Sequence, residues 1–118
     1  MVIISTDSND VPRYLLVDSS GRLYINLNAP TTIYNGQKNV TTAGTRAVLG
    51  SSQAILSITI IAKLTNTGNI YVGNSSVTSS NGAILSAGDS LSLDTNNISN
   101  VYIDSDVSGE GVSYIAVG

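Results

Sequence analysis

The segment that most constrains the fold is "AILSITIIAKL", the most hydrophobic stretch of the chain. Its β-branched residues favour an extended strand, because such side chains pack well on a pleated surface. Successive side chains of a strand point to opposite faces, so this segment divides into two sets. One set mixes Ser and Thr with Ile, whereas the other is entirely apolar. We therefore predict a central strand whose core-facing side chains are Leu56, Ile58, Ile60 and Ala62.

Similar short apolar segments recur along the chain, roughly every 8–12 residues, with Gly, Asn, Asp and Ser between them. No segment shows the sustained three- and four-residue apolar spacing of an amphipathic helix. Roughly nine or ten short strands are expected, an arrangement typical of sandwiches and barrels. The sequence thus predicts an all-β fold, either an antiparallel β-sandwich or a jelly-roll-like barrel.

The N-terminal part contains a separate hairpin pattern, "RYLLVDSSGRLYINLN". It predicts two strands joined by a turn in which Gly21 can take a positive φ. The tripeptide Asn28-Ala29-Pro30 is typical of a corner or short linker. We therefore expect two parts: an N-terminal β-hairpin arm at 1–30, with strands Tyr14–Val17 and Arg22–Leu27, and a sandwich domain at 31–118.

Two further turns are predicted within the sandwich domain. Asn35-Gly36 has the residues of a tight hairpin turn, which would separate strands at Thr31–Tyr34 and Lys38–Thr42. Ala87-Gly88-Asp89 is expected to be a turn that precedes a strand at Ser90–Asp94.

The charge distribution excludes one large class of partners. The 118 residues include only five basic and eight acidic side chains, and the net charge is −3. Because the basic residues form no cluster, we expect no surface that tracks nucleic-acid phosphates. The longest apolar run is too short to span a bilayer, and the N-terminus lacks a charged leader, so a soluble protein is expected and no membrane partner.

The chain contains neither His nor Cys. Ser-His-Asp and Cys-His catalysis, disulfides and the usual zinc sites are therefore impossible. No glycine-rich phosphate loop is present, and no cofactor is indicated. A non-enzymatic role is the leading expectation. A small carboxylate-dependent hydrolase, for example through Asp89 and Asp94, stays open as an alternative.

One acidic segment could bind a metal ion. In "DSDVSGE", the oxygens of Asp104, Asp106 and Glu110 are of the kind that Ca²⁺ prefers, although the EF-hand spacing is not matched. The alternative is that Asp104 and Asp106 lie on the solvent face at the end of a strand. The sequence favours this second interpretation.

The six tyrosines all lie within or beside predicted strands, where cross-strand packing is their default role. An exposed Tyr71 or Tyr102 beside Asn and Asp side chains could instead contact a glycan. Three Asn-X-Ser/Thr sequons, at Asn39, Asn74 and Asn97, would matter if the protein meets a glycosylation machinery.

The region from about residue 40 to 118 resembles a small β domain of virion proteins in tailed phages and related archaeal viruses. The resemblance is carried by Thr42-Ala43-Gly44-Thr45, by Asn69-Ile70-Tyr71-Val72-Gly73 before a Ser-rich loop, by Ala87-Gly88-Asp89-Ser90, and by Val101-Tyr102-Ile103-Asp104 before a Gly-rich turn. It includes no catalytic signature. The resemblance implies an architectural role on a virion, as capsid decoration or as part of the tail or its fibres.

The expected function is accordingly that of a non-enzymatic virion structural protein. Its partners would be further copies of itself, most plausibly as a trimer, and major capsid or tail proteins. The arm would contribute the interface residues Tyr14, Leu16, Leu23 and Ile25, unless the hairpin simply pairs with the main sheet. The alternative function is a glycan-binding adhesion module on a virion or a cell surface.

Overall fold

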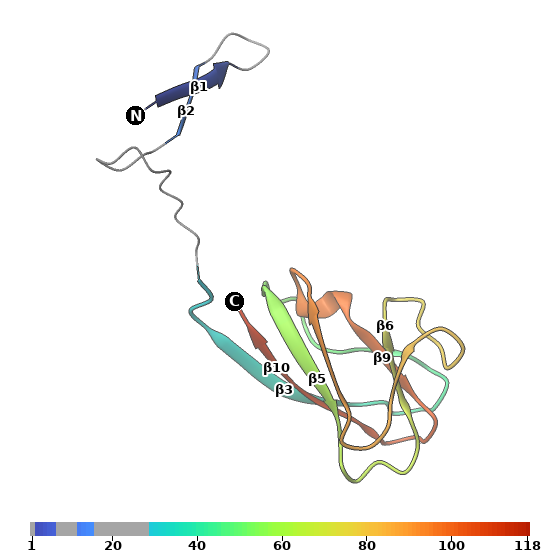
Figure 1. Cartoon of the computed structure of the whole chain (residues 1–118). Helices are drawn as coiled ribbons and strands as arrows, with labels where there is room; N and C mark the ends of the chain where they lie inside the picture. Colours follow the sequence, from blue (N-terminus) through green and yellow to red (C-terminus); the bar gives the residue numbers. More distant parts are fainter. Residues whose placement is uncertain (1, 7–11, 16–28) are drawn as a thin grey trace.

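The computed structural model describes residues 2–6, 12–15 and 29–118 (Figure 1). The described part of the chain contains ten strands and one short 3₁₀ turn. Their bounds are β1 Val2–Thr6, β2 Pro12–Leu15, β3 Ile33–Asn39, β4 Ala47–Val48, β5 Ser57–Ala62, β6 Ile70–Gly73, β7 Ala83–Leu85, β8 Ser90–Asp94, η1 Ile98–Asn100, β9 Tyr102–Ser105 and β10 Gly111–Val117. In this part of the chain, no helix has the length and apolar character needed to cross a membrane.

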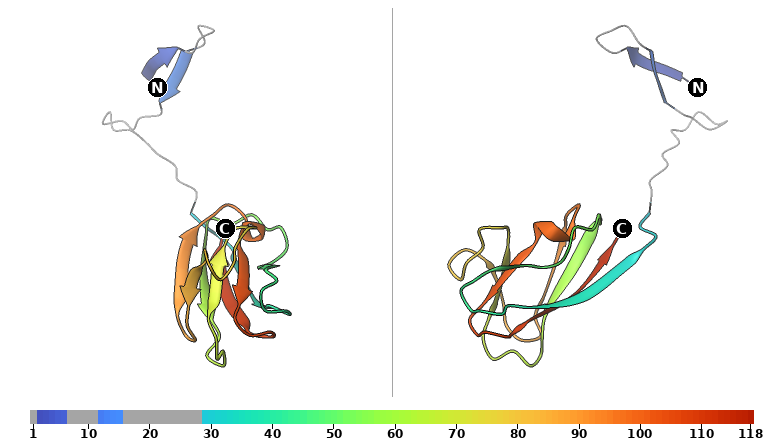
Figure 2. Two further views of the ribbon diagram at one scale, coloured as in Figure 1. Left: turned by 90° about the vertical axis from the view of Figure 1, so that its right-hand side faces the viewer. Right: turned by 180° about the vertical axis from the view of Figure 1, so that it is seen from behind.

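Eight of these strands form two four-stranded antiparallel sheets that pack face to face (Figures 1 and 2). One sheet has the strand order β3-β10-β5-β8 and the other has the order β4-β9-β6-β7. Side chains from the inner faces of both sheets belong to a single hydrophobic core. The prediction of an all-β antiparallel sandwich is therefore confirmed.

The predicted central strand is β5, which lies between β10 and β8. Its residues Ile58, Ile60 and Ala62 are buried in the core, as predicted. Leu56, however, is 52% exposed, and the neighbouring Ile55 is buried in its place. The prediction was wrong for Leu56 because the chain leaves an isolated bridge at Ala54 and enters β5 only at Ser57, so the alternation changes phase between them.

The predicted hairpin turn at Asn35-Gly36 is also wrong. The chain continues through it as one strand, β3, which pairs along its whole length with β10. Gly36 lies opposite Tyr114, and a Cβ atom at Gly36 would come within 2.5 Å of the Tyr114 hydroxyl oxygen. The glycine therefore makes room for an aromatic ring rather than for a turn. The predicted turn at Ala87-Gly88-Asp89 is confirmed, with Gly88 at φ +84°.

The N-terminal strands β1 and β2 form a two-stranded antiparallel sheet of their own, in which Ile3 pairs with Tyr14. The predicted second arm of the hairpin, Arg22–Leu27, lies outside the described residues. The turn predicted to end at Gly21 lies outside them as well.

The two-layer arrangement predicts that the same substitution lowers the free energy of unfolding much more on the inner face of a sheet than on its outer face. Ile60 of β5 has no exposed surface, whereas Ile115 of β10 is 45% exposed on the outer face. Ile60→Ala should lower the free energy of unfolding by about 2–5 kcal/mol, because it leaves a cavity in the core. Ile115→Ala should cost less than about 1 kcal/mol, since the side chain stays partly solvated. Urea denaturation of both variants measures the difference, and equal costs would contradict the assignment of faces.

Candidate functional site

The acidic segment 104–110 lies at one end of the sandwich, where β9 ends and the chain turns into β10. Glu110 is directed at the loop that connects β5 to β6. Its Oε1 accepts hydrogen bonds from the amide and hydroxyl of Thr67, the hydroxyl at 2.7 Å, and its Oε2 accepts from the amide of Gly68 at 3.0 Å. These bonds hold the pKa of the Glu110 carboxyl below its ordinary value, the hydroxyl contributing most. One carboxylate thus fixes the position of the 65–69 loop.

Asp106 binds the same loop from the other side. Its Oδ2 accepts from the amide of Asn69 at 3.1 Å, and its Oδ1 accepts from the hydroxyl of Tyr71 at 2.8 Å. A Cβ atom at Gly68 would lie 2.8 Å from the Cβ of Asp106, so the loop passes this carboxylate closely only with glycine at that position. Asp106 is exposed, in agreement with the interpretation that it lies on the solvent side.

Asp104 does not lie on the solvent side. It is only 3% exposed, and its Oδ1 accepts from the amides of Gly44 at 3.0 Å and Ser105 at 2.8 Å. The prediction of a solvent face was wrong for Asp104 because the 41–46 loop lies over this part of β9. Ser108 adds to the same contact by accepting from the amide of Ala43.

The three acidic side chains therefore act as separate hydrogen-bond acceptors for two loops. Among the residues that the structure describes, no three His, Cys, Asp or Glu side chains come together as a possible metal-binding group. The geometry supports a structural role for Asp104, Asp106 and Glu110 more than a role as calcium ligands, because their oxygens already face backbone and hydroxyl donors.

A glycan contact at Tyr71 would require an exposed ring, but only 7% of the surface of Tyr71 is accessible. The 74–82 loop folds back against it, and a Cβ atom at Gly82 would lie 2.7 Å from the Cβ of Tyr71. The hydrogen bond to Asp106 raises the pKa of the Tyr71 phenol, and burial and the charges of Asp106 and Asp104 raise it further. Tyr71 is therefore a buried donor, not a platform for a sugar ring, whereas Tyr102 stays half-exposed on β9.

The other predicted residues divide between the described and undescribed parts of the chain. Tyr14 lies in β2, whereas Leu16, Leu23 and Ile25 lie outside the described residues. Asp89 and Asp94 stand at opposite ends of β8, about 17 Å apart at the rise of an antiparallel strand, which exceeds the spacing of a glycosidase pair.

The side chains of the three sequon asparagines all make hydrogen bonds. Asn39 accepts from the Lys63 ammonium at 2.7 Å, and Asn74 accepts from the amide of Ser76 at 2.9 Å. The side-chain nitrogen of Asn97 donates to the Ser52 hydroxyl at 3.0 Å.

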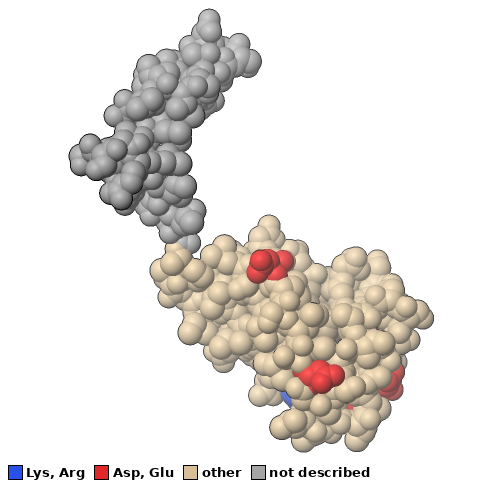
Figure 3. Space-filling view, in the orientation of Figure 1, with Lys and Arg blue, Asp and Glu red and all other residues tan. Residues whose placement is uncertain are grey.

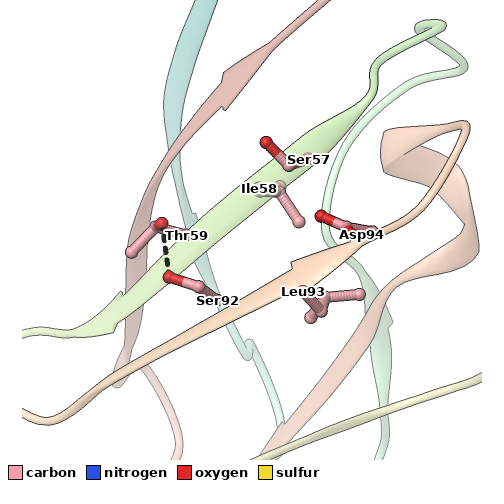
Figure 4. A pocket seen from close by; sticks show the side chains of 6 residues that line it. All are labelled: Ser57, Ile58, Thr59, Ser92, Leu93 and Asp94. Carbon is pink, nitrogen blue, oxygen red and sulfur yellow. Dashed lines mark hydrogen bonds between the residues drawn. The ribbon is translucent and has the colours of Figure 1, made fainter.

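Two open depressions border the β3-β10-β5-β8 sheet. The first, of about 450 Å³, lies between β5 and β8, where the hydroxyls of Thr59 and Ser92 share a hydrogen bond of 2.8 Å (Figure 4). The second, of about 420 Å³, lies between β3 and the 51–53 segment and is lined by Ile33, Tyr34, Asn35, Ser51, Ser52, Gln53, Ile98 and Tyr114.

Sequence reasoning missed the second depression because it placed a turn at Asn35-Gly36. The signal that could have located it is Tyr114, a strand tyrosine that needs a glycine opposite it on a neighbouring strand.

The chain matches no known protein-family description, no curated protein and no solved structure in the comparisons made with each.

The Glu110 contact predicts a specific dependence of stability on pH. Because the folded-state pKa lies below the unfolded-state value, the contact stabilises the fold above about pH 5 and is lost as the pH falls through the folded-state pKa. Glu110→Gln should therefore be less stable than the wild type at pH 7, and this difference should shrink towards pH 3. Urea denaturation across that range measures it.

Asp94→Asn is the control, since it removes one negative charge from the end of β8 and leaves the 65–69 loop intact. A difference between wild type and Glu110→Gln that stays constant from pH 7 to pH 3 would contradict the role assigned to Glu110.

Proposed function

We propose that this chain is a non-enzymatic structural protein of a virus particle, most concretely a capsid decoration protein or a component of the tail or its fibres. The observation that carries the proposal is the two-stranded sheet formed by β1 and β2, which has no third strand among the described residues. An isolated hairpin is marginally stable in water at best. Contact with another chain, either a capsid or tail protein or a second copy, would supply the missing stabilisation.

The outer face of the β3-β10-β5-β8 sheet supports the same proposal. The register gives this face Ser, Thr, Asn, Gln, Ile and Val side chains, and Asp94 is its single charged residue within the four strands. In the view of Figure 3, the few charged side chains of the described residues likewise form small, separate patches. A protein surface can pack against such a face without desolvating charges.

The proposed location on a virus particle is based on the resemblance of residues 40–118 to small β domains of phage and archaeal virus particles. The loops at the acidic end suit a particle surface, because backbone hydrogen bonds to Asp104, Asp106 and Glu110 fix them. Such loops need neither a disulfide nor a metal to keep their shape. We propose a homotrimer as the state in which the arm makes its contacts.

Removing the arm tests this proposal. In dilute solution, light scattering after size exclusion should give a trimer for the full chain and a monomer for residues 29–118, since the truncated chain keeps every strand of the sandwich. In the full chain, Tyr14→Asp should have the same effect, because it places a charge in β2. Ser92→Asp, on the outer edge of the sandwich, serves as the control and should remain trimeric. Monomers for both chain lengths would contradict self-association through the arm.

Glycan binding is a second candidate, and the depression beside β3 favours it. Two half-exposed tyrosines, Tyr34 and Tyr114, lie there next to the amide of Gln53 and the hydroxyls of Ser51 and Ser52. Aromatic faces together with uncharged hydrogen-bonding groups are suited to a neutral sugar. We place the candidate glycan contact at this depression and not at Tyr71, because the ring of Tyr71 is covered by the 74–82 loop.

A glycan array separates the two functions. If the protein is an adhesion module, the wild type should bind a defined set of neutral glycans. Tyr34→Ala should then lose at least tenfold in affinity, while Tyr102→Ala on the other sheet should retain it. Absence of binding by the wild type would remove this second candidate.

A further inference from the structure

The four edges of the two sheets are not equally protected against pairing with another strand. Natural proteins keep edge strands short, or they place charges on them, because exposed backbone groups attract further strands. Strands β4 and β7 are only two and three residues long, and β8 follows Asp89 and ends at Asp94. The seven-residue β3 carries a single charge, Lys38, near its end. It is the longest edge strand of the sandwich, and no charge lies at its centre.

The hydrogen-bonding phase of β3 leaves alternate backbone groups free. Thr32 and Gly118 exchange two backbone bonds, of 2.8 and 2.9 Å, which sets the phase of the β3–β10 ladder. Bonding groups alternate in direction along an antiparallel strand, so Tyr34, Gly36 and Lys38 bond to β10. The amides and carbonyls of Ile33, Asn35, Gln37 and Asn39 point away from it. No loop or side chain among the described residues accepts a hydrogen bond from these four amides.

The free edge is also accessible. Ile33 is 65% exposed, and the side chains of Asn35, Gln37 and Asn39 are exposed as well. Even the residues of β3 that face inward are only half-buried. The 420 Å³ depression lies beside the first half of the strand. Another strand could therefore approach this edge without displacing a covering element of the described chain.

We propose that β3 pairs antiparallel with β3 of a second copy, joining two four-stranded sheets into one continuous sheet. A two-fold axis at Gly36 sets Asn35 opposite Gln37 and Ile33 opposite Asn39 of the second copy. These four residue pairs can exchange two backbone bonds each. The register also sets Lys38 opposite Tyr34, so that the two lysines do not face each other and a cation lies near an aromatic ring.

The second copy is the occupant that this edge fits best. The opposed residues on the outer face are amides and one isoleucine, so that each pair can form without an unpaired charge. The inference rests on the proposal that the chain works in several copies. It names a contact separate from the arm, one that joins arm-linked trimers as the protein concentration rises.

The test uses the full chain with Gln37→Pro. Proline removes an amide that points away from β10, so the sandwich keeps its internal bonds while the new ladder loses a donor. Light scattering over a concentration series should show self-association at least tenfold weaker than that of the wild type. Ser92→Pro removes a free-edge amide of β8 in the same way and should assemble like the wild type.

Hydrogen exchange of the wild type provides a measurement that needs no variant. The amides of Asn35, Gln37 and Asn39 should become protected as the protein concentration rises. Wild-type assembly by Gln37→Pro, or exchange at these amides that is independent of concentration, would overturn the inference. If the 29–118 truncation loses mass while Gln37→Pro does not, the edge contact is overturned and the proposed role of the arm still stands.

Discussion

The contact between the inner faces of the two sheets is the interaction on which the rest of the structure depends. Ile60, Ile103 and Val112 have no exposed surface, and they join β5, β9 and β10 into one core. The chain contains no Cys or His, so neither a disulfide nor a zinc site through those residues can replace this burial. Apolar burial, at about 25 cal/mol per Å², is therefore the main favourable contribution to folding. The loops and sheet edges occupy defined positions only because the core holds the strands that they connect.

Acidic side chains that accept hydrogen bonds from loops are a second source of order. Glu110 and Asp106 accept hydrogen bonds from backbone amides of the 65–69 loop, and Asp104 accepts one from the amide of Gly44. Hydrogen bonds to a charged acceptor are stronger than those between neutral groups. Three of the eight acidic residues of the chain thus fix loops in the described part of the structure. The outer face of the β3-β10-β5-β8 sheet has Asp94 as its single charged residue within the four strands.

The sequence predicts those parts of the fold that depend on local alternation. The inward residues of β5, the strand β8 and the turn at Gly88 follow from neighbours within a few positions. The errors have distant causes. The Asn-Gly pair at 35–36 lies in a strand because Tyr114, far along the chain, needs the space above Gly36. Asp104 and Tyr71 are buried because loops from elsewhere cover the outer face of β9 and β6. Alternation indicates which residues share a face, but it carries no information about which loop will cover that face.

The position of β10 has a consequence for how the chain is made. This strand lies between β3 and β5, so the middle of one sheet comes from residues 111–117. While a ribosome extends the chain, β3 and β5 emerge long before the strand that joins them. Until residue 117 has been synthesised, both present unpaired backbone groups and an unfinished apolar surface to other chains. The Ser, Thr and Asn residues between the strands would then help to keep the nascent chain in solution, before they take any place on a finished surface.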